Sequence, residues 1–328
     1  MKQIIKKGSF LTLMFLLLGC LSLYAADNDL ITRQITITLE KAGTLPDRIA
    51  SSKKNKITNL KIIGEINGTD LRMIREMAGS NSNGNSTDGK LSVLDLSEAK
   101  IVKGGDSYYN DYNDNDYYTS NDVIGSEAFR ACSGLTSLTL PAGITGIGDF
   151  AFCGCSGLTS LTLPAGITKI GSFAFSGCIG LTSLTLPAGI TKIDFFSFSV
   201  CRGLTSLTLP ASITSIGFGA FDSSGLTSIY VYAEKVPKGR NVFVGVDAKK
   251  CTLYVPKGTR NDYCASDFGN YIENIVEFDA TGIDKITTST DVEEVARYSV
   301  NGQRLSAPTK GLNIVKYSDG SVKKVTVQ

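Results

Sequence analysis

The residues best suited to chemistry in this chain are its eight cysteines, because a thiolate can bind a metal ion or attack an electrophile. Four of them, Cys132, Cys155, Cys178 and Cys201, recur with a period of 23 residues. Equivalent side chains of a repeat point the same way, whereas a disulfide needs two Cβ vectors that converge. We therefore expect four free, buried thiols in one column rather than a disulfide or metal ladder.

The remaining chemistry-bearing residues give no catalytic or metal site. Cys153 and Cys155 form a C-x-C pair, but no second pair follows at zinc spacing. Cys251 and Cys264 lie 13 residues apart, and a disulfide between them stays an alternative to two free thiols. The chain has no histidine, which excludes Ser-His-Asp and Cys-His catalytic units. The sequence also has no paired-carboxylate motif, so it predicts no enzyme, no metal and no cofactor.

Hydroxyl side chains recur with the same period and form the first candidate binding surface. They alternate with leucines, so they should share the exposed face of a sheet. Short polar side chains of this kind could contact a partner, or could simply keep an exposed sheet soluble. The candidate residues are Ser137, Thr139, Ser160, Thr162, Ser183, Thr185, Ser206 and Thr208, followed by Ser228 and Tyr230.

A second candidate is the insertion at residues 104–122, which is rich in tyrosine and aspartate. Tyrosine gives a large contact area at little entropic cost, which favours a contact loop; a solvated surface insertion is the alternative. An EF-hand-like calcium loop fits poorly, because Asp116 stands where that loop needs glycine. The five tyrosines are Tyr108, Tyr109, Tyr112, Tyr117 and Tyr118.

The element that positions these residues is a unit repeated four times, starting at Leu135, Leu158, Leu181 and Leu204. Each copy begins L-x-x-L-x-L-P, in which alternating leucines predict a strand and proline ends it. The second half of each copy carries isoleucines and a phenylalanine pair such as Phe150/Phe152, which we expect in the core. Copies stacked about 4.8 Å apart would form a solenoid with a parallel sheet on one face and turn-rich return limbs.

Two smaller expectations concern a helix and the net charge. A short helix is expected after Thr69, which we interpret as its N-cap. Net charge is only +2, so no bulk field favours nucleic acid. Composition changes along the chain predict six parts. They are a signal peptide (1–25), an N-terminal capping segment (27–56), the repeat array (57–225, with clean copies at 135–225), a C-terminal cap (226–278), a linker (279–290) and a small β module (291–328).

The N-terminus is positively charged and then apolar, a pattern that predicts export. Two processing routes are open. A signal peptidase would cleave before Ala26, whereas processing at a lipobox, Leu17-Leu18-Gly19-Cys20, would leave Cys20 lipidated. No second long apolar run follows, so membrane contact is expected only through such a lipid anchor or through surface attachment.

Units such as LTSLTLPAGITKIGSFAFSGC resemble the BspA-like (Treponema pallidum-type) leucine-rich repeat. The tail, YSVNGQRLSAPTKGLNIVKYSDGSVKKVTVQ, is similar to the C-terminal sorting modules of type IX secretion cargo. These resemblances imply an exported cell-surface or secreted protein, adhesin-like, that binds host extracellular matrix or bacterial surface proteins. A structural spacer is one alternative, and a glycan-binding accessory protein using Tyr230, Tyr232 and the tyrosine-rich insertion is another.

Overall fold

The computed structural model describes residues 30–279, 294–299, 304–305, 311–317 and 322–327. The chain divides into two compact units, Met1–Ala280 and Thr281–Gln328. The expected signal peptide, with Cys20, lies outside the described residues, as does the expected linker apart from Asp279.

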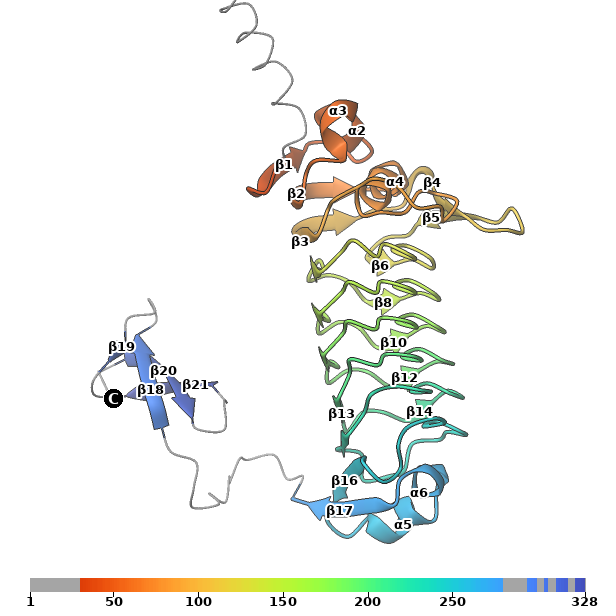
Figure 1. The fold of residues 1–328 in the computed structure, drawn as a ribbon, viewed down its shortest axis with the longest axis vertical. Helices are drawn as coiled ribbons and strands as arrows, with labels where there is room; N and C mark the ends of the chain where they lie inside the picture. The colour runs from red at the N-terminus through yellow and green to blue at the C-terminus, as the bar shows by residue number, and fades with distance from the viewer. Residues whose placement is uncertain (1–29, 280–293, 300–303, 306–310, 318–321, 328) are drawn as a thin grey trace, which may run out of the picture. The chain divides into compact units, whose positions relative to one another are not determined.

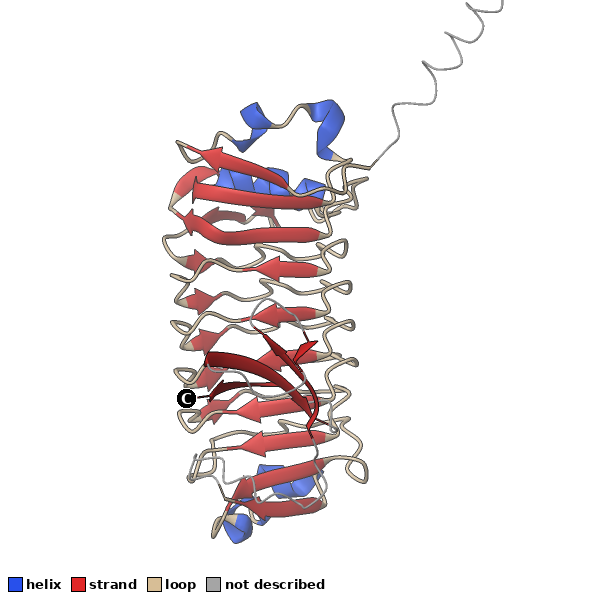
Figure 2. Cartoon of the chain, turned by 90° about the vertical axis from the view of Figure 1, so that its left-hand side faces the viewer, coloured by secondary structure: helices blue, strands red, loops and turns tan. Residues whose placement is uncertain are grey.

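A ten-stranded parallel sheet runs the length of the first unit, in the order β1-β2-β3-β7-β9-β11-β13-β15-β16-β17 (Figures 1 and 2). Its central strands pair in strict register, with Leu138 opposite Leu161 and Leu161 opposite Leu184. The strands are β1 (Ile35–Leu39), β2 (Asn59–Ile66), β3 (Val93–Ile101), β7 (Ser137–Thr139), β9 (Ser160–Thr162), β11 (Ser183–Thr185), β13 (Ser206–Leu209), β15 (Ser228–Val231), β16 (Thr252–Pro256) and β17 (Asn274–Phe278).

The return limbs carry a second, five-stranded parallel sheet in the order β14-β12-β10-β8-β6. It adds regular pairing to limbs that were expected to be only turn-rich, because one isoleucine of each coil pairs with its counterpart, as Ile170 does with Ile193. Its strands are β6 (Val123–Ile124), β8 (Gly146–Ile147), β10 (Lys169–Ile170), β12 (Lys192–Ile193) and β14 (Ser215–Ile216). The expected solenoid is confirmed, and it has a sheet on each side of its core.

The core between the two sheets is a stack of equivalent side chains. Phe152, Phe175 and Phe198 are fully buried, and the first two rings stack with centroids 5.1 Å apart. The other member of each pair differs from the expectation: Phe150, Phe173 and Phe196 are only half-buried. Their φ angles are 56°, 55° and 51°, which turns the backbone so that these rings leave the core. A bulky residue in this region costs about 1–3 kcal/mol.

The N-terminal end of the array is covered by helices α2 (Leu45–Arg48), α3 (Ser51–Lys54) and α4 (Gly68–Met77). The N-cap of α4 is Asn67, not Thr69 as the sequence suggested. The Asn67 side chain accepts a hydrogen bond from the Thr69 backbone N–H at 3.0 Å. The buried Asp70 carboxylate accepts another from the Asn67 backbone N–H at 2.9 Å, which completes a capping box.

A backbone ladder joins the segment of each coil that carries the phenylalanine pair to the same segment of the next coil. Within this segment, N–H groups of the earlier coil donate to carbonyls of the later coil. The N–H of Phe129 donates to the carbonyl of Ala151, and the N–H of Phe152 donates to the carbonyl of Ala174, each at 2.7 Å. In this segment each coil therefore gives N–H groups to the next coil and offers carbonyls to the previous one. The short return-limb strands beside it bond in the opposite direction, as the Gly171 N–H does with the Ile147 carbonyl at 2.9 Å. In the first limb of this ladder, no preceding coil supplies donors for the carbonyls of Ser126, Ala128 and Arg130, the counterparts of carbonyls that accept in later coils.

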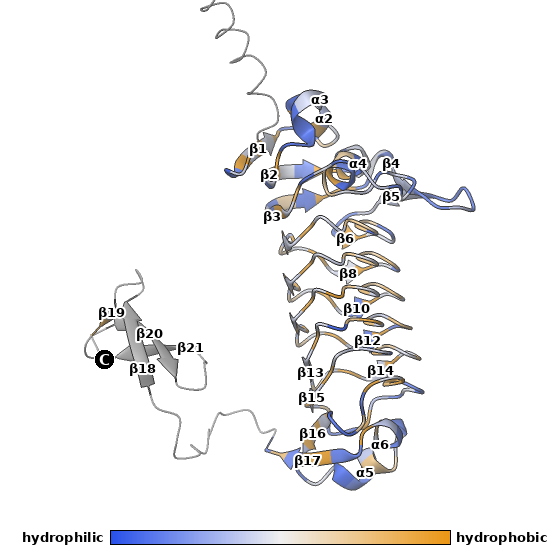
Figure 3. Cartoon of the chain, in the orientation of Figure 1, coloured by the Kyte–Doolittle hydropathy of each residue, from blue (hydrophilic) through white to orange (hydrophobic). Residues whose placement is uncertain are grey.

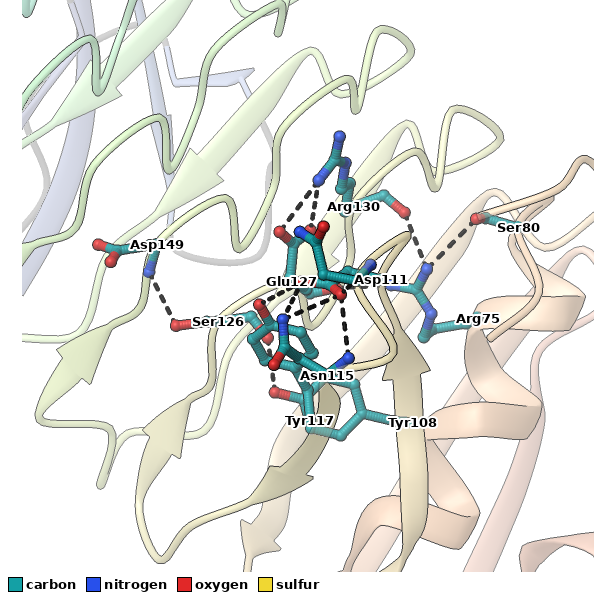
Figure 4. Close-up of polar contacts among 11 residues, drawn as sticks. Arg75, Ser80, Tyr108, Asp111, Asn115, Tyr117, Ser126, Glu127, Arg130 and Asp149 are labelled. Carbon is teal, nitrogen blue, oxygen red and sulfur yellow. Dashed lines mark hydrogen bonds and ion pairs between the residues drawn. The ribbon is translucent and has the colours of Figure 1, made fainter. Parts of the chain in front are cut away.

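Side chains supply those missing donors (Figure 4). The hydroxyl of Tyr108 donates to the Ser126 carbonyl at 2.6 Å. The fully buried guanidinium of Arg75, from α4, donates to the Ala128 carbonyl at 3.0 Å and to the Arg130 carbonyl at 3.1 Å. It also reaches the Glu127 carbonyl at 2.7 Å. One positive side chain and one phenol thus replace a missing coil, and we call this pair the donor cap.

At the C-terminal end of the ladder, an acidic side chain accepts hydrogen bonds from backbone N–H groups. The Asp267 carboxylate accepts from the backbone N–H of Asn241 at 2.8 Å and from that of Val242 at 3.0 Å. Asp267 begins α6 (Asp267–Tyr271), which with α5 (Arg260–Cys264) lies beside β16 and β17 at the end of the array (Figure 1). The ladder thus begins at a cation, Arg75, and ends at an anion, Asp267.

The second unit contains a four-stranded antiparallel sheet in the order β19-β18-β20-β21. Its strands are β18 (Glu294–Ser299), β19 (Arg304–Leu305), β20 (Gly311–Tyr317) and β21 (Val322–Val327). The small β module expected at residues 291–328 is therefore a four-stranded sheet in the part that the structure describes.

Candidate binding surfaces

The first candidate surface is the solvent-facing side of the ten-stranded sheet. Register places the predicted hydroxyl residues in two columns, one running through Ser160 and Ser183 and one through Thr162 and Thr185. Ser137 and Ser228, at the margins, are half-buried, and the columns between them are exposed. The leucine between each serine and threonine points inward, so the alternation L-x-L sends the hydroxyls outward together.

A charged cluster ends the threonine column toward the N-terminus of the array. Thr139 pairs with Asp95, and Asp95 pairs with Lys61. The Lys61 ammonium lies 2.6 Å from a Glu98 carboxylate oxygen and 3.6 Å from Asp95. The hydrogen bond to Glu98 is the largest influence on Lys61 and raises its pKa above the ordinary value. Lys61 is shared by the two carboxylates, so this end of the face is polar and the three residues together carry one net negative charge.

An aromatic cluster ends the same column toward the C-terminus. Thr208 pairs with Tyr230, and Tyr230 pairs with Tyr254. The two tyrosine rings stack with centroids 4.4 Å apart and planes 6° apart. Phe278 packs edge-on against Tyr232 at 5.1 Å, and against Tyr230 at 6.0 Å. We call Tyr230, Tyr232, Tyr254 and Phe278 the sheet-end cluster.

The side chains of the sheet-end cluster are partly buried but remain accessible to solvent. Tyr230, Tyr254 and Phe278 are half-buried, while 37% of Tyr232 is exposed. Partial burial raises the pKa of Tyr230 above its ordinary value. Sequence reasoning singled out Tyr230 and Tyr232 but missed Tyr254 and Phe278. Alignment of CTLYVP with LTSIYVY would have placed Tyr254 in the tyrosine column.

The second candidate, the insertion at 104–122, is an ordered hairpin of β4 (Gly104–Asn110) and β5 (Asp116–Thr119), drawn mostly in the hydrophilic colour in Figure 3. Tyr108 and Tyr109 are only 1% and 2% exposed, so in this structure they offer almost no surface to a ligand. Tyr108 belongs to the donor cap, and the Tyr109 ring lies 4.7 Å from the Arg75 guanidinium carbon. These two tyrosines attach the hairpin to the array.

The outer half of the hairpin presents the other three tyrosines. Tyr112 is 90% exposed and Tyr118 is 54% exposed, whereas Tyr117 is half-buried. Asp111 holds the turn, because its carboxylate accepts from the backbone N–H of Asn113 at 2.8 Å and from the Tyr117 hydroxyl at 3.2 Å (Figure 4). Within the described ranges, no group of three or more His, Cys, Asp or Glu residues could hold a metal ion.

The cysteine column has the structure that its period predicts. Cys132, Cys155, Cys178 and Cys201 are buried and free. The Cys178 thiol donates to the Phe152 carbonyl at 3.2 Å, and Cys155 and Cys201 repeat this bond in their own coils. Burial raises the pKa of Cys132 to about 11 and that of Cys201 to about 12, which keeps these thiols protonated. Cys251 is buried and Cys264 exposed, and both are free.

No arrangement suited to covalent chemistry emerges among the described residues. A hollow of about 370 Å³ lies among the N-terminal helices and is lined by Lys54, Arg72, Met73 and Glu76, among others. Lys54 and Glu76 are paired across it at 2.7 Å. Such an open hollow presents an ion pair and no activated nucleophile.

Register, burial and the two parallel sheets define a leucine-rich-repeat solenoid. Residues 122–247 match the family described as the BspA type leucine rich repeat region, in six copies, and this stretch is a BspA-type repeat region. The match covers the clean copies at 135–225 and reaches into the segment expected to be a C-terminal repeat cap (226–278). BspA-type repeats are non-enzymatic, in agreement with the expectation from the sequence. No curated protein matches the chain.

Three solved structures are similar to this chain. A leucine-rich repeat protein from T. pallidum is 27% identical, with 48% of this chain and 81% of that chain covered and a TM-score of 0.38. The pneumococcal vaccine antigen PcpA is 16% identical, with 68% and 69% covered and a TM-score of 0.36. A leucine-rich repeat protein from Bacteroides ovatus is 20% identical, with 74% and 59% covered and a TM-score of 0.36.

Proposed function

We propose that this protein is an exported, surface-associated, adhesin-like protein that binds host matrix or microbial surface proteins through the exposed face of its ten-stranded sheet. The observation that carries the proposal is the continuity of that face: hydroxyl columns run without interruption into the sheet-end cluster. Interfaces commonly combine adaptable polar contacts with a few aromatic anchors. Tyr230, which pairs with Thr208, and the adjacent Tyr254 and Tyr232 supply the aromatic part of such a surface.

Export is part of the proposal and has its own support. The N-terminal 25 residues read as a signal peptide, and the second unit is a small antiparallel module of the kind expected for a sorting tail. None of the helices in the described ranges is long and apolar enough to cross a membrane. A leucine-rich protein from Faecalibacterium prausnitzii that is similar to this chain is described as a cell surface protein.

A proteinaceous ligand is favoured over a glycan by the geometry of the cluster. Sugars pack their C–H groups on the open face of an aromatic ring. Tyr230 and Tyr254 stack on each other, so each ring gives one face to its neighbour. The pair therefore has fewer open ring faces for a sugar than two separate rings would have, and its hydroxyls and ring edges suit the mixed apolar and polar side chains of a protein surface.

A binding screen of the mature protein against immobilised matrix proteins, bacterial surface proteins and a glycan array tests this function. For the ligand found, Tyr232→Ser should weaken binding about tenfold or more, as expected for an aromatic anchor. Ser160→Lys should also weaken it, because it places a bulky charge in the hydroxyl column.

The matched control is Thr168→Lys, which adds the same charge to an exposed residue on the return limb of the same coil. Equal binding by Ser160→Lys and Thr168→Lys, with Tyr232→Ser unchanged, would refute a sheet-face site. Loss only in a Tyr112→Ser/Tyr118→Ser variant would move the site to the hairpin. The absence of any ligand would leave the spacer alternative.

A further inference from the structure

A second surface, on the return limbs, exposes aromatic rings that the core does not need. Phe150, Phe173 and Phe196 have left-handed backbone conformations, and their rings stack at 4.8 Å and 5.0 Å. The next coil has Gly219 at this position, which adopts the same conformation without a Cβ. Three coils therefore hold a half-buried phenylalanine where glycine would be less strained.

The residues that precede this column extend the surface. Phe195 is 54% exposed and Phe218 is 41% exposed, and the Phe218 ring packs edge-on against Phe196 at 5.4 Å. Their counterparts in the two earlier coils are Asp149 and Ser172. The surface is thus most apolar near its centre, at Phe195 and Phe218.

Opposite charges flank that apolar centre. Asp149 is exposed at one end, and Arg240 is exposed at the other. Arg240 precedes Asn241, whose φ of 53° continues the left-handed column. At about 4.8 Å per coil, four coils separate the two charges by about 19 Å. Phe195 lies midway between them in coil number.

We propose that this phenylalanine face is the interface of an antiparallel dimer, in which the second copy is related by a two-fold axis that passes near Phe195. A two-fold axis there brings Phe195 onto Phe195 of the partner subunit. It also pairs Asp149 of each copy with the other copy's Arg240, so the same ion pair forms twice. A parallel arrangement in register would instead place like charges opposite each other.

The site is distinct from the sheet face, because it lies on the opposite limb of the coil. Dimerisation through it leaves both hydroxyl faces uncovered. Two copies held together would present two identical ligand sites, and a surface with many ligand copies would then be bound with higher avidity than by one copy.

Sedimentation velocity of the full mature chain, over a wide concentration range, tests the interface. The wild-type protein should form dimers as concentration rises. Phe195→Lys should abolish them, because it places two ammonium groups together at the axis. Arg240→Asp should weaken dimerisation about tenfold, since it opposes Asp149 twice. Asp149→Arg should weaken it similarly, and the double variant Asp149→Arg/Arg240→Asp should restore it.

Thr162→Lys, on the sheet face, is the control and should dimerise like the wild type. Because the Asp149 carboxylate also accepts a local bond from the Ser172 N–H at 2.7 Å, thermal melting of each variant checks that the fold is kept. A wild-type protein that stays monomeric overturns the proposal. So does a dimer that is insensitive to Phe195→Lys, or a double variant no better than its single parents.

Discussion

Replacement of Arg75 by methionine should destabilise the N-terminal end of the array, because Arg75 supplies donors that no backbone group can supply. Its guanidinium donates five hydrogen bonds, to the carbonyls of Glu127, Ala128, Arg130 and Asn81 and to the Ser80 hydroxyl. The bond to Ala128 is buried, and leaving that carbonyl unpaired costs about 1–3 kcal/mol. The Glu127 carbonyl keeps a bond from the Arg130 backbone N–H at 3.1 Å. The carbonyls of Asn81 and Arg130 are only partly buried, so water can partly replace their donor.

The expected loss in the free energy of unfolding is therefore about 1–3 kcal/mol, mostly from the Ala128 carbonyl. Urea unfolding monitored by circular dichroism measures it. Hydrogen exchange locates it: the Phe129 and Ala131 amides should exchange faster, while those of Phe175 and Gly177, further along the ladder, should change little.

Two matched variants sharpen this test. Arg72→Met removes an exposed arginine from the same helix and should change stability by less than about 0.5 kcal/mol. Tyr108→Phe removes only the donor to the Ser126 carbonyl and should cost about 1–2 kcal/mol. If Arg75→Met were no more destabilising than Arg72→Met, the donor-cap reasoning would be wrong.

Three further predictions concern the array and the tail. Deletion of residues 158–180 should leave a folded, shorter protein with cooperative melting, because the new neighbours present matching coils; a molten product would contradict the repeat interpretation. In the native protein, alkylation should reach the exposed Cys264 first and leave Cys178 and Cys201 unmodified until unfolding, since burial raises the pKa of both. Removal of residues 291–328 should leave an array with unchanged melting that no longer reaches the cell surface, and normal delivery of the truncated protein would exclude a sorting role.

The sequence predicted those features that depend on local spacing. The 23-residue period and the L-x-L alternation correctly placed Leu161 and Leu184 in the core and Ser160 and Thr162 outside. The same period placed the four cysteines in one buried column. These features follow from neighbours in the chain and from the identity of successive copies, which a sequence displays directly.

The sequence did not predict features that depend on backbone conformation or on distant partners. Nothing in F-A-F says that Phe150 adopts a positive φ and turns outward while Phe152 turns in. Tyr108 is a core residue because of the Ser126 carbonyl, 18 positions away, and Arg75 is buried because of carbonyls more than 50 positions away. Composition made Tyr108 resemble its exposed neighbour Tyr112, and only the pairing of β4 with β5 separates them.

The one-way backbone ladder also makes the number of coils an adjustable length. Its two ends are chemically different, with donors supplied at Arg75 and acceptors at Asp267, but the coils between them make the same backbone bonds to their neighbours. Duplication or loss of a coil therefore leaves both ends chemically complete. Each such event moves the β4–β5 hairpin and the sheet-end cluster apart or together by about 4.8 Å. Unequal recombination between near-identical copies can therefore change the distance between the hairpin and the sheet-end cluster without altering either one.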